Sequence, residues 1–191
     1  MTEHVLLELK HKNGTVAKIY QDENSESPRS WDNLGTLKTW IRNYDFSDKN
    51  APNLNSSDDF EDWSKENDVA LFMRIDFCDY GSGGLRISMD DGDYHSDGVI
   101  FVTNERLFKE FAQKTLTGEV GPETLKKAKD VLKAELRTLN QWANGEVYGY
   151  TIEKSVTCKT CKHTENENVD SCWGFYGMET IKEELQSQGF K

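Results

Sequence analysis

The sequence predicts an α+β fold in a single domain, with a mainly antiparallel sheet, one long amphipathic helix and several short helices. Three observations lead to this prediction. The chain has 191 residues, the length of one ordinary domain, and shows no internal repeat or low-complexity linker. An Asn13-Gly14 pair between two apolar runs indicates a β-hairpin. Residues 122–143 place apolar side chains at helical spacing. We therefore treat residues 1–191 as one α+β domain.

In the first part of the chain, the hairpin is expected to join residues 5–9 and 16–20 around the Asn-Gly turn. Asp32 is positioned to cap a short helix to residue 41, with Leu34, Leu37, Trp40 and Ile41 on one face. Residues 57–67 read as an acidic helix, whose carboxylates cluster at its start, where the helix dipole favours them.

In the middle of the chain, residues 69–77, 85–89 and 99–102 are rich in apolar and β-branched side chains and are expected to be neighbouring strands. Residues 104–114 are predicted to form a helix that buries its apolar side chains. The clearest element is the long helix that starts at Pro122 and stops before an Asn-Gly pair.

The last part of the chain is expected to hold one strand and one helix. Residues 146–153 alternate tyrosine and isoleucine with other side chains, as a strand does, and residues 180–188 form a short helix that docks Ile181 and Leu185. Between them lies a cysteine-rich stretch to which the pattern assigns no helix or strand.

Composition limits the class of protein. Only 36% of residues are hydrophobic, but 21 aromatic residues supply large buried areas. No apolar run approaches the ~18 residues of a membrane span, and the first residues do not resemble a secretory signal peptide. We therefore expect a soluble cytoplasmic protein that makes no contact with membranes.

The negative charge is concentrated in one segment. The chain has a formal net charge of −11, which argues against direct binding of nucleic acid. Residues 45–97 hold 14 acids and four bases, so nearly all of the imbalance lies there. This segment is either a solvated acidic surface or a binding face for a basic protein. In the extreme form of the second interpretation, its carboxylates imitate the phosphates of a nucleic acid. The candidate face consists of Asp58, Asp59, Glu61, Asp62, Asp90, Asp91, Asp93 and Asp97.

The same segment contains two stretches that resemble ligand-binding motifs. Residues 88–97 contain four carboxylates and one imidazole, but an EF-hand loop needs oxygen ligands five and three residues before Gly92, where Ile87 and Met89 stand. An irregular cation site stays open as an interpretation. The glycine-rich stretch 81–84 has no Gly-Lys-Ser/Thr after it, which favours a hairpin turn over a phosphate loop.

The cysteine-rich stretch predicts a structural zinc site. A C-x-x-C turn lets two thiolates occupy adjacent corners of a tetrahedron, so the candidate ligands are Cys158, Cys161, His163 and Cys172. Residues 155–177 would then be a zinc-clip substructure. The alternatives are reduced thiols with no ligand role, a redox C-x-x-C pair, and Cys172 as a nucleophile.

Three blocks together resemble an uncharacterised family of small proteins carried by bacteriophages, prophages and other mobile elements. They are Ser27–Thr36 (SPRSWDNLGT), Gly145–Tyr150 (GEVYGY) and Asp170–Gly177 (DSCWGFYG). The resemblance implies a location in the host-cell cytoplasm but carries over no catalytic residue. A Tyr-Asp-His-Ser-Gly motif expected in that family is replaced here by residues 78–83, without the histidine. In the blocks themselves, Trp31 is expected to pack as a core or staple aromatic, and Trp173 either packs or lines a pocket for a planar ligand.

Three functions remain as hypotheses. The first is a non-enzymatic accessory protein of a mobile element that binds and modulates a host protein, such as a defence or nucleic-acid-processing factor, through its acidic face. The second is a small enzyme acting on a nucleotide or related metabolite, with no catalytic residue assigned, whose pocket would gather Gly81–Gly84, Asp91, Asp93, His95 or Cys172. The third is a zinc-stabilised structural module.

Overall fold

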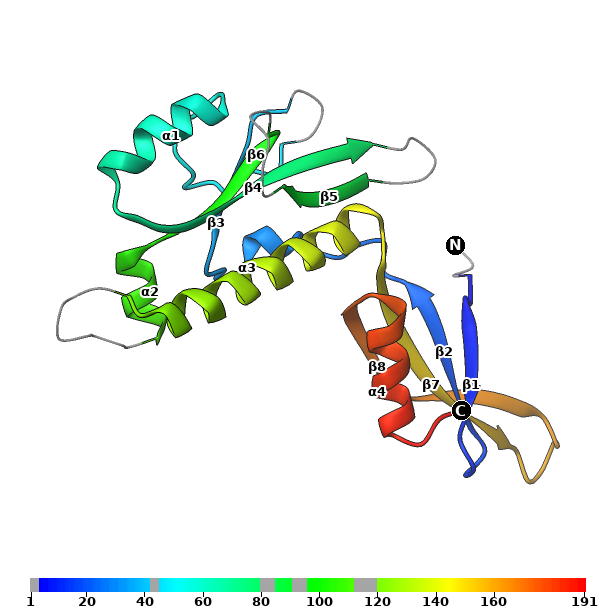
Figure 1. The fold of residues 1–191 in the computed structure, drawn as a ribbon. Helices are drawn as coiled ribbons and strands as arrows, with labels where there is room; N and C mark the ends of the chain where they lie inside the picture. Colours follow the sequence, from blue (N-terminus) through cyan, green and yellow to red (C-terminus); the bar gives the residue numbers. More distant parts are fainter. Residues whose placement is uncertain (1–3, 42–44, 80–84, 91–95, 112–119) are drawn as a thin grey trace. The chain divides into compact units, whose positions relative to one another are not determined.

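The computed structural model describes residues 4–41, 45–79, 85–90, 96–111 and 120–191. The chain forms two compact units (Figure 1). One, here called the split unit, contains Met1–Glu26 and Gln141–Lys191, and the other, the inserted unit, contains Ser27–Asn140. The inserted unit therefore interrupts the split unit in sequence. That residues 1–191 form one domain stays a prediction.

The split unit is built on an antiparallel sheet with the strand order β1-β2-β7-β8. The predicted hairpin is confirmed, since β1 pairs with β2 and Leu9 lies opposite Ala17. Gly14 takes a φ of +88° in the turn, a conformation that glycine adopts without strain. The strands and the helix of this unit are β1 (Leu7–Lys10), β2 (Thr15–Gln21), β7 (Val147–Thr157), β8 (Thr164–Tyr176) and α4 (Met178–Ser187).

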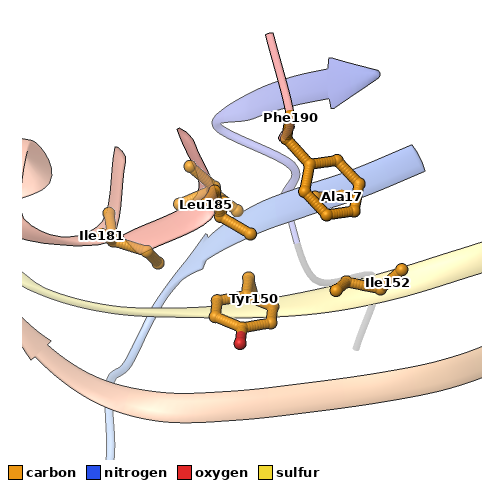
Figure 2. Packing of buried hydrophobic residues seen from close by; sticks show 7 residues of the cluster. Ala17, Tyr150, Ile152, Ile181, Leu185 and Phe190 are labelled. Carbon is orange, nitrogen blue, oxygen red and sulfur yellow. The ribbon is translucent and has the colours of Figure 1, made fainter. Parts of the chain in front are cut away.

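Helix α4 covers one face of this sheet. Its Ile181 and Leu185 are fully buried, as the sequence predicts, against apolar side chains of β2 and β7 (Figure 2). Phe190, just beyond the helix, closes the same cluster. The cluster contains Ala17, Ile19, Tyr150, Ile152, Ile181, Leu185 and Phe190.

The inserted unit holds a second antiparallel sheet with the order β3-β6-β4-β5. In the described part of this unit, the helical elements are a 3-10 turn, two short helices and the long helix. The elements are η1 (Pro28–Ser30), β3 (Thr36–Thr39), α1 (Ser57–Glu66), β4 (Val69–Asp79), β5 (Leu85–Asp90), β6 (Gly98–Thr103), α2 (Asn104–Phe111) and α3 (Pro122–Ala143), of which α3 belongs to this unit as far as Asn140.

Strand β6 is buried on both faces because helices pack on each side of it. Phe60 of α1 packs against Val99 and Phe101 on one face. Ile100 points to the other face, where it and Leu132 of α3 lie against the backbone of Gly35. The sheet of the inserted unit is therefore held between α1 and α3 (Figure 1).

The structure confirms the α+β class, the antiparallel pairing and the long amphipathic helix, and it divides the strands between two sheets. The predicted helix over residues 32–41 is wrong, because residues 36–39 form β3 and pair with β6. Trp31 is 51% exposed and is not a core residue. No helix in the described part of the chain has the length and apolar character needed to cross a membrane.

Candidate functional site

The acidic segment forms a helix whose charged side faces solvent. Helix α1 begins at the N-cap Ser56, whose hydroxyl oxygen accepts the Asp59 N–H at 3.1 Å. Phe60 is buried, and this fixes the helix by its apolar side. The exposed carboxylates of the helix, here called the acidic helix face, are Asp58, Asp59, Glu61, Asp62 and Glu66.

Two cations lie on this face. Lys65 donates to Asp62 at 2.8 Å and holds the pKa of that carboxyl below its ordinary value, although both side chains are exposed. Arg74 of β4 pairs with Glu61. Five carboxylates against these two cations leave the acidic helix face with a net charge of −3. The face therefore stays negative after its local pairing.

The other predicted acidic residues divide into three cases. The backbone of Asp90 in β5 lies opposite that of Arg74 in β4, the strand next to it in the sheet. Asp91 and Asp93 lie outside the described residues. The carboxylate of Asp97 accepts the Phe77 N–H at 2.9 Å, which gives it a role within the sheet.

The block SPRSWDNLGT lines an open pocket of about 440 Å³ in the inserted unit, together with residues 47–50. Beside the pocket, the buried Arg29 guanidinium makes a bidentate pair with Asp48, at 2.9 and 2.6 Å, and reaches Glu135 at 3.1 Å. The pocket is also lined by polar residues that carry hydroxyl, amide and ammonium groups. They are Ser27, Ser30, Asn33, Lys49 and Asn50. The pocket is a candidate small-molecule site, and the buried ion pairs of Arg29 form part of its wall.

Glu135 ties this block to α3. Its carboxylate accepts the Leu34 N–H at 2.7 Å in addition to its pair with Arg29. Burial raises the pKa of Glu135 above its ordinary value, although Arg29 and the backbone donors oppose the shift. Gly35 has no room for a side chain, because an added Cβ would lie 2.4 Å from Leu132 Cδ2. Arg29, Leu34 and Gly35 of the block therefore have structural roles.

The other two blocks lie side by side as β7 and β8. Gly149 pairs with Trp173, whose ring lies so close that a Cβ on Gly149 would stand 2.1 Å from it. The ring centroid of Tyr20 is 6.2 Å from that of Trp173. Trp173 is 41% exposed, so it packs on the sheet and also presents part of its ring to solvent. The glycine of one block thus makes room for the tryptophan of the other.

The predicted metal ligands are not all brought together. Cys158, Cys161 and His163 lie in or beside the turn between β7 and β8. Cys172 lies eight residues along β8 from Thr164, or roughly 26 Å at 3.3 Å per residue. In the part of the chain that the structure describes, no group of three His, Cys, Asp or Glu side chains is placed to hold a metal ion. Residues 155–177 form most of a long hairpin.

The residues of the enzyme hypothesis are mostly not described. Gly81–Gly84, Asp91, Asp93 and His95 lie outside the described residues. Cys172 is exposed on β8, opposite Tyr150. The Arg29–Asp48–Glu135 cluster is not predicted by the sequence patterns, in which its one signal is the position of Arg29 in the SPRSWDNLGT block.

No family model, curated protein or solved structure matches this chain. The choice among its candidate sites therefore depends on the geometry of the side chains.

Proposed function

We propose that the protein is a non-enzymatic accessory protein of a bacteriophage or other mobile element, which binds and modulates a host protein through the acidic helix face. The observation that carries this proposal is the exposure of five carboxylates on α1, a helix anchored through Phe60. A concentrated field of this kind accelerates encounter with a basic surface and disfavours acidic competitors. The resemblance of three sequence blocks to a family of mobile-element proteins supports the assignment to a bacteriophage or other mobile element.

An exposed aromatic ring adds an apolar contact beside the acidic helix face. Phe72 is 42% exposed, and its ring centroid lies 5.2 Å from that of Phe60. Arg74, two residues further along β4, pairs with Glu61 of the helix. Aromatic anchors surrounded by charged groups are common at centres of protein interfaces. The partner is therefore expected to offer an apolar pocket for Phe72 within a rim of lysine or arginine.

A nucleic-acid-processing or defence factor fits this chemistry. Proteins that bind DNA or RNA carry basic surfaces that neutralise phosphates. Carboxylates on a rigid helix are suited to occupy such a surface and to compete with the nucleic acid. Binding by this route blocks the partner without any reaction, which agrees with a non-enzymatic role.

The test is capture of a partner from host lysate by tagged protein at low and high salt. The variant Asp58→Asn/Asp62→Asn/Glu66→Gln neutralises three carboxylates of the acidic helix face. A matched control, Glu165→Gln/Glu167→Gln/Glu183→Gln, removes the same charge from exposed positions of the split unit. The proposal expects the wild-type protein to capture one stoichiometric partner at low salt but not at high salt. The α1 variant should fail to capture this partner, and the control should capture it as the wild type does. Equal capture by both variants would contradict it.

A further inference from the structure

The turn between β7 and β8 has a defined backbone geometry. The N–H of Cys158 donates to the His163 carbonyl at 2.8 Å, and the N–H of Lys162 donates to the Cys158 carbonyl at 3.0 Å. Lys162 adopts a left-handed conformation with a φ of +60°. These two hydrogen bonds close the loop that carries Cys158 and Cys161. The two cysteines are therefore held on one ordered turn.

Cys158 and Cys161 are both accessible from solvent. Both side chains are exposed, and neither forms a disulfide. Thiolates are the form that binds zinc, and a C-x-x-C turn supplies two adjacent corners of a tetrahedral site. The turn is thus half of a zinc site.

The described residues of this chain do not supply the other half of a zinc site at that place. Cys172 is roughly 26 Å away along β8, and the Nε2 of His163 lies 3.5 Å from a carboxylate oxygen of Glu165. Among the residues with described positions, no third His, Cys, Asp or Glu joins the pair in a group that could hold a metal ion. A tetrahedral ion on this turn needs ligands from another molecule.

The turn lies at the end of a projecting arm, formed by residues 155–166. Strand β2 pairs with β7 only as far as Lys154, opposite Thr15. Beyond that point, β7 and β8 pair only with each other, and every residue of the arm is exposed. A two-stranded ribbon of this kind is marginally stable alone in water, and a metal at its tip would stabilise it. The arm gives a second molecule free access to both thiols.

We propose that Cys158 and Cys161 of two copies of this chain together bind one Zn²⁺, which joins the two arms tip to tip about a twofold axis. The reaction is a ligand exchange without oxidation or reduction: four thiols release four protons to solvent, the hydrated Zn²⁺ releases its water ligands, and four Zn–S bonds form. This inference does not depend on the acidic helix face, which belongs to the inserted unit.

The charge of the turn supports this arrangement. Four thiolates and one Zn²⁺ carry a net charge of −2. Each copy carries Lys159 and Lys162 on the same turn, so two copies bring four ammonium groups close to the proposed ion. Without the ion, the lysines of two arms repel one another. The proposal therefore expects dimer formation to require zinc.

The experiment titrates the reduced full-length protein with Zn²⁺ and follows mass by sedimentation velocity. The expected end point is one ion per two chains, with a doubled mass that returns to the monomer value on addition of a chelator. Co²⁺ is the spectroscopic probe and should give the spectrum of a tetrahedral tetrathiolate with the same end point. One ion per chain on a monomer, or no binding, would overturn the proposal.

Variants separate this site from the other thiols. Cys158→Ser/Cys161→Ser should lose both the tetrathiolate spectrum and the dimer, with an unchanged circular dichroism spectrum because both side chains are exposed. Cys78→Ser/Cys172→Ser, the matched control, should keep both. Loss of binding in the control would overturn the proposal. Lys159→Glu/Lys162→Glu keeps the thiols and should raise the zinc concentration needed for dimer formation by tenfold or more. An unchanged zinc concentration for dimer formation would also count against the proposal.

Discussion

Replacement of Arg29 by methionine tests the cluster that positions the SPRSWDNLGT block. The Arg29 side chain is 7% exposed, and its partners Asp48 and Glu135 are 10% and 11% exposed. The substitution preserves most of the side-chain volume but leaves two buried carboxylates without their cation. Removal of one partner from a buried ion pair costs about 3–5 kcal/mol. We expect the variant to lose that much free energy of unfolding at pH 7.

The deficit should depend on pH. Burial already raises the pKa of Glu135 in the folded wild-type protein, and the loss of Arg29 removes a hydrogen bond and a charge that oppose this shift. When the pKa of a carboxyl is higher in the folded state than in the unfolded state, its contribution to the free energy of unfolding is largest below the unfolded-state pKa. That contribution is lost as the pH rises through the folded-state pKa. The difference between Arg29→Met and wild type should therefore shrink between pH 7 and pH 5.

Urea unfolding, followed by tryptophan fluorescence at both pH values, measures this difference. The control Lys65→Met removes an exposed pair with Asp62, and its midpoint should match that of the wild type. A wild-type midpoint for Arg29→Met at pH 7 would refute the reasoning. A deficit that grows on acidification would refute the role assigned to Glu135.

Two further substitutions test packing in each unit by the same unfolding assay. Gly35→Ala places a methyl group 2.4 Å from Leu132 Cδ2 and should cost about 1–3 kcal/mol, whereas Gly121→Ala, with no atom within 4 Å of its added Cβ, should be nearly neutral. Equal midpoints for these two variants would show that the Gly35 contact relaxes freely. Leu185→Ala empties a fully buried position under α4 and should cost about 2–5 kcal/mol, whereas Leu6→Ala, at a position 42% exposed, should cost much less. A larger loss at Leu6 would contradict the assigned core.

Local patterns predicted the elements whose structure depends on near neighbours in sequence. The Asn13-Gly14 turn defines a hairpin through its own conformation, and its strands pair as expected. Helix α3 has buried side chains at helical spacing from Thr124 to Leu139. In α4, Ile181 and Leu185 lie four residues apart on the buried side. Each of these signals is contained within one element.

Elements determined by distant partners were missed. Leu34, Leu37 and Ile41 match helical spacing, but residues 36–39 pair with β6 and form a strand that contains Leu37. Strand β8 carries mostly polar side chains and is exposed along most of its length, so it shows no alternation of buried and exposed positions. Its pairing with β7 determines its structure, and a single segment does not reveal that pairing.

The candidate sites show the same division. The charge count located the carboxylates of α1, because they are adjacent in sequence. It did not reveal that Asp97 binds the Phe77 N–H, twenty residues away. Arg29 lies 19 positions from Asp48 and 106 positions from Glu135 in the sequence. Cys161 lies in the turn before β8, whereas Cys172 lies eight residues along that strand from Thr164. Which of these residues lie close together in space is determined by the fold, and the pattern of a single segment does not reveal it.

The most direct test of the central claim is the association rate of the purified partner with this protein across a range of salt concentrations. The account predicts a rate that falls steeply with salt for the wild type and for the Glu165/Glu167/Glu183 control. It predicts a rate about tenfold or more lower, with little salt dependence, for the Asp58/Asp62/Glu66 variant. The same rate and the same salt dependence for all three proteins would show that the acidic helix face does not bind the partner.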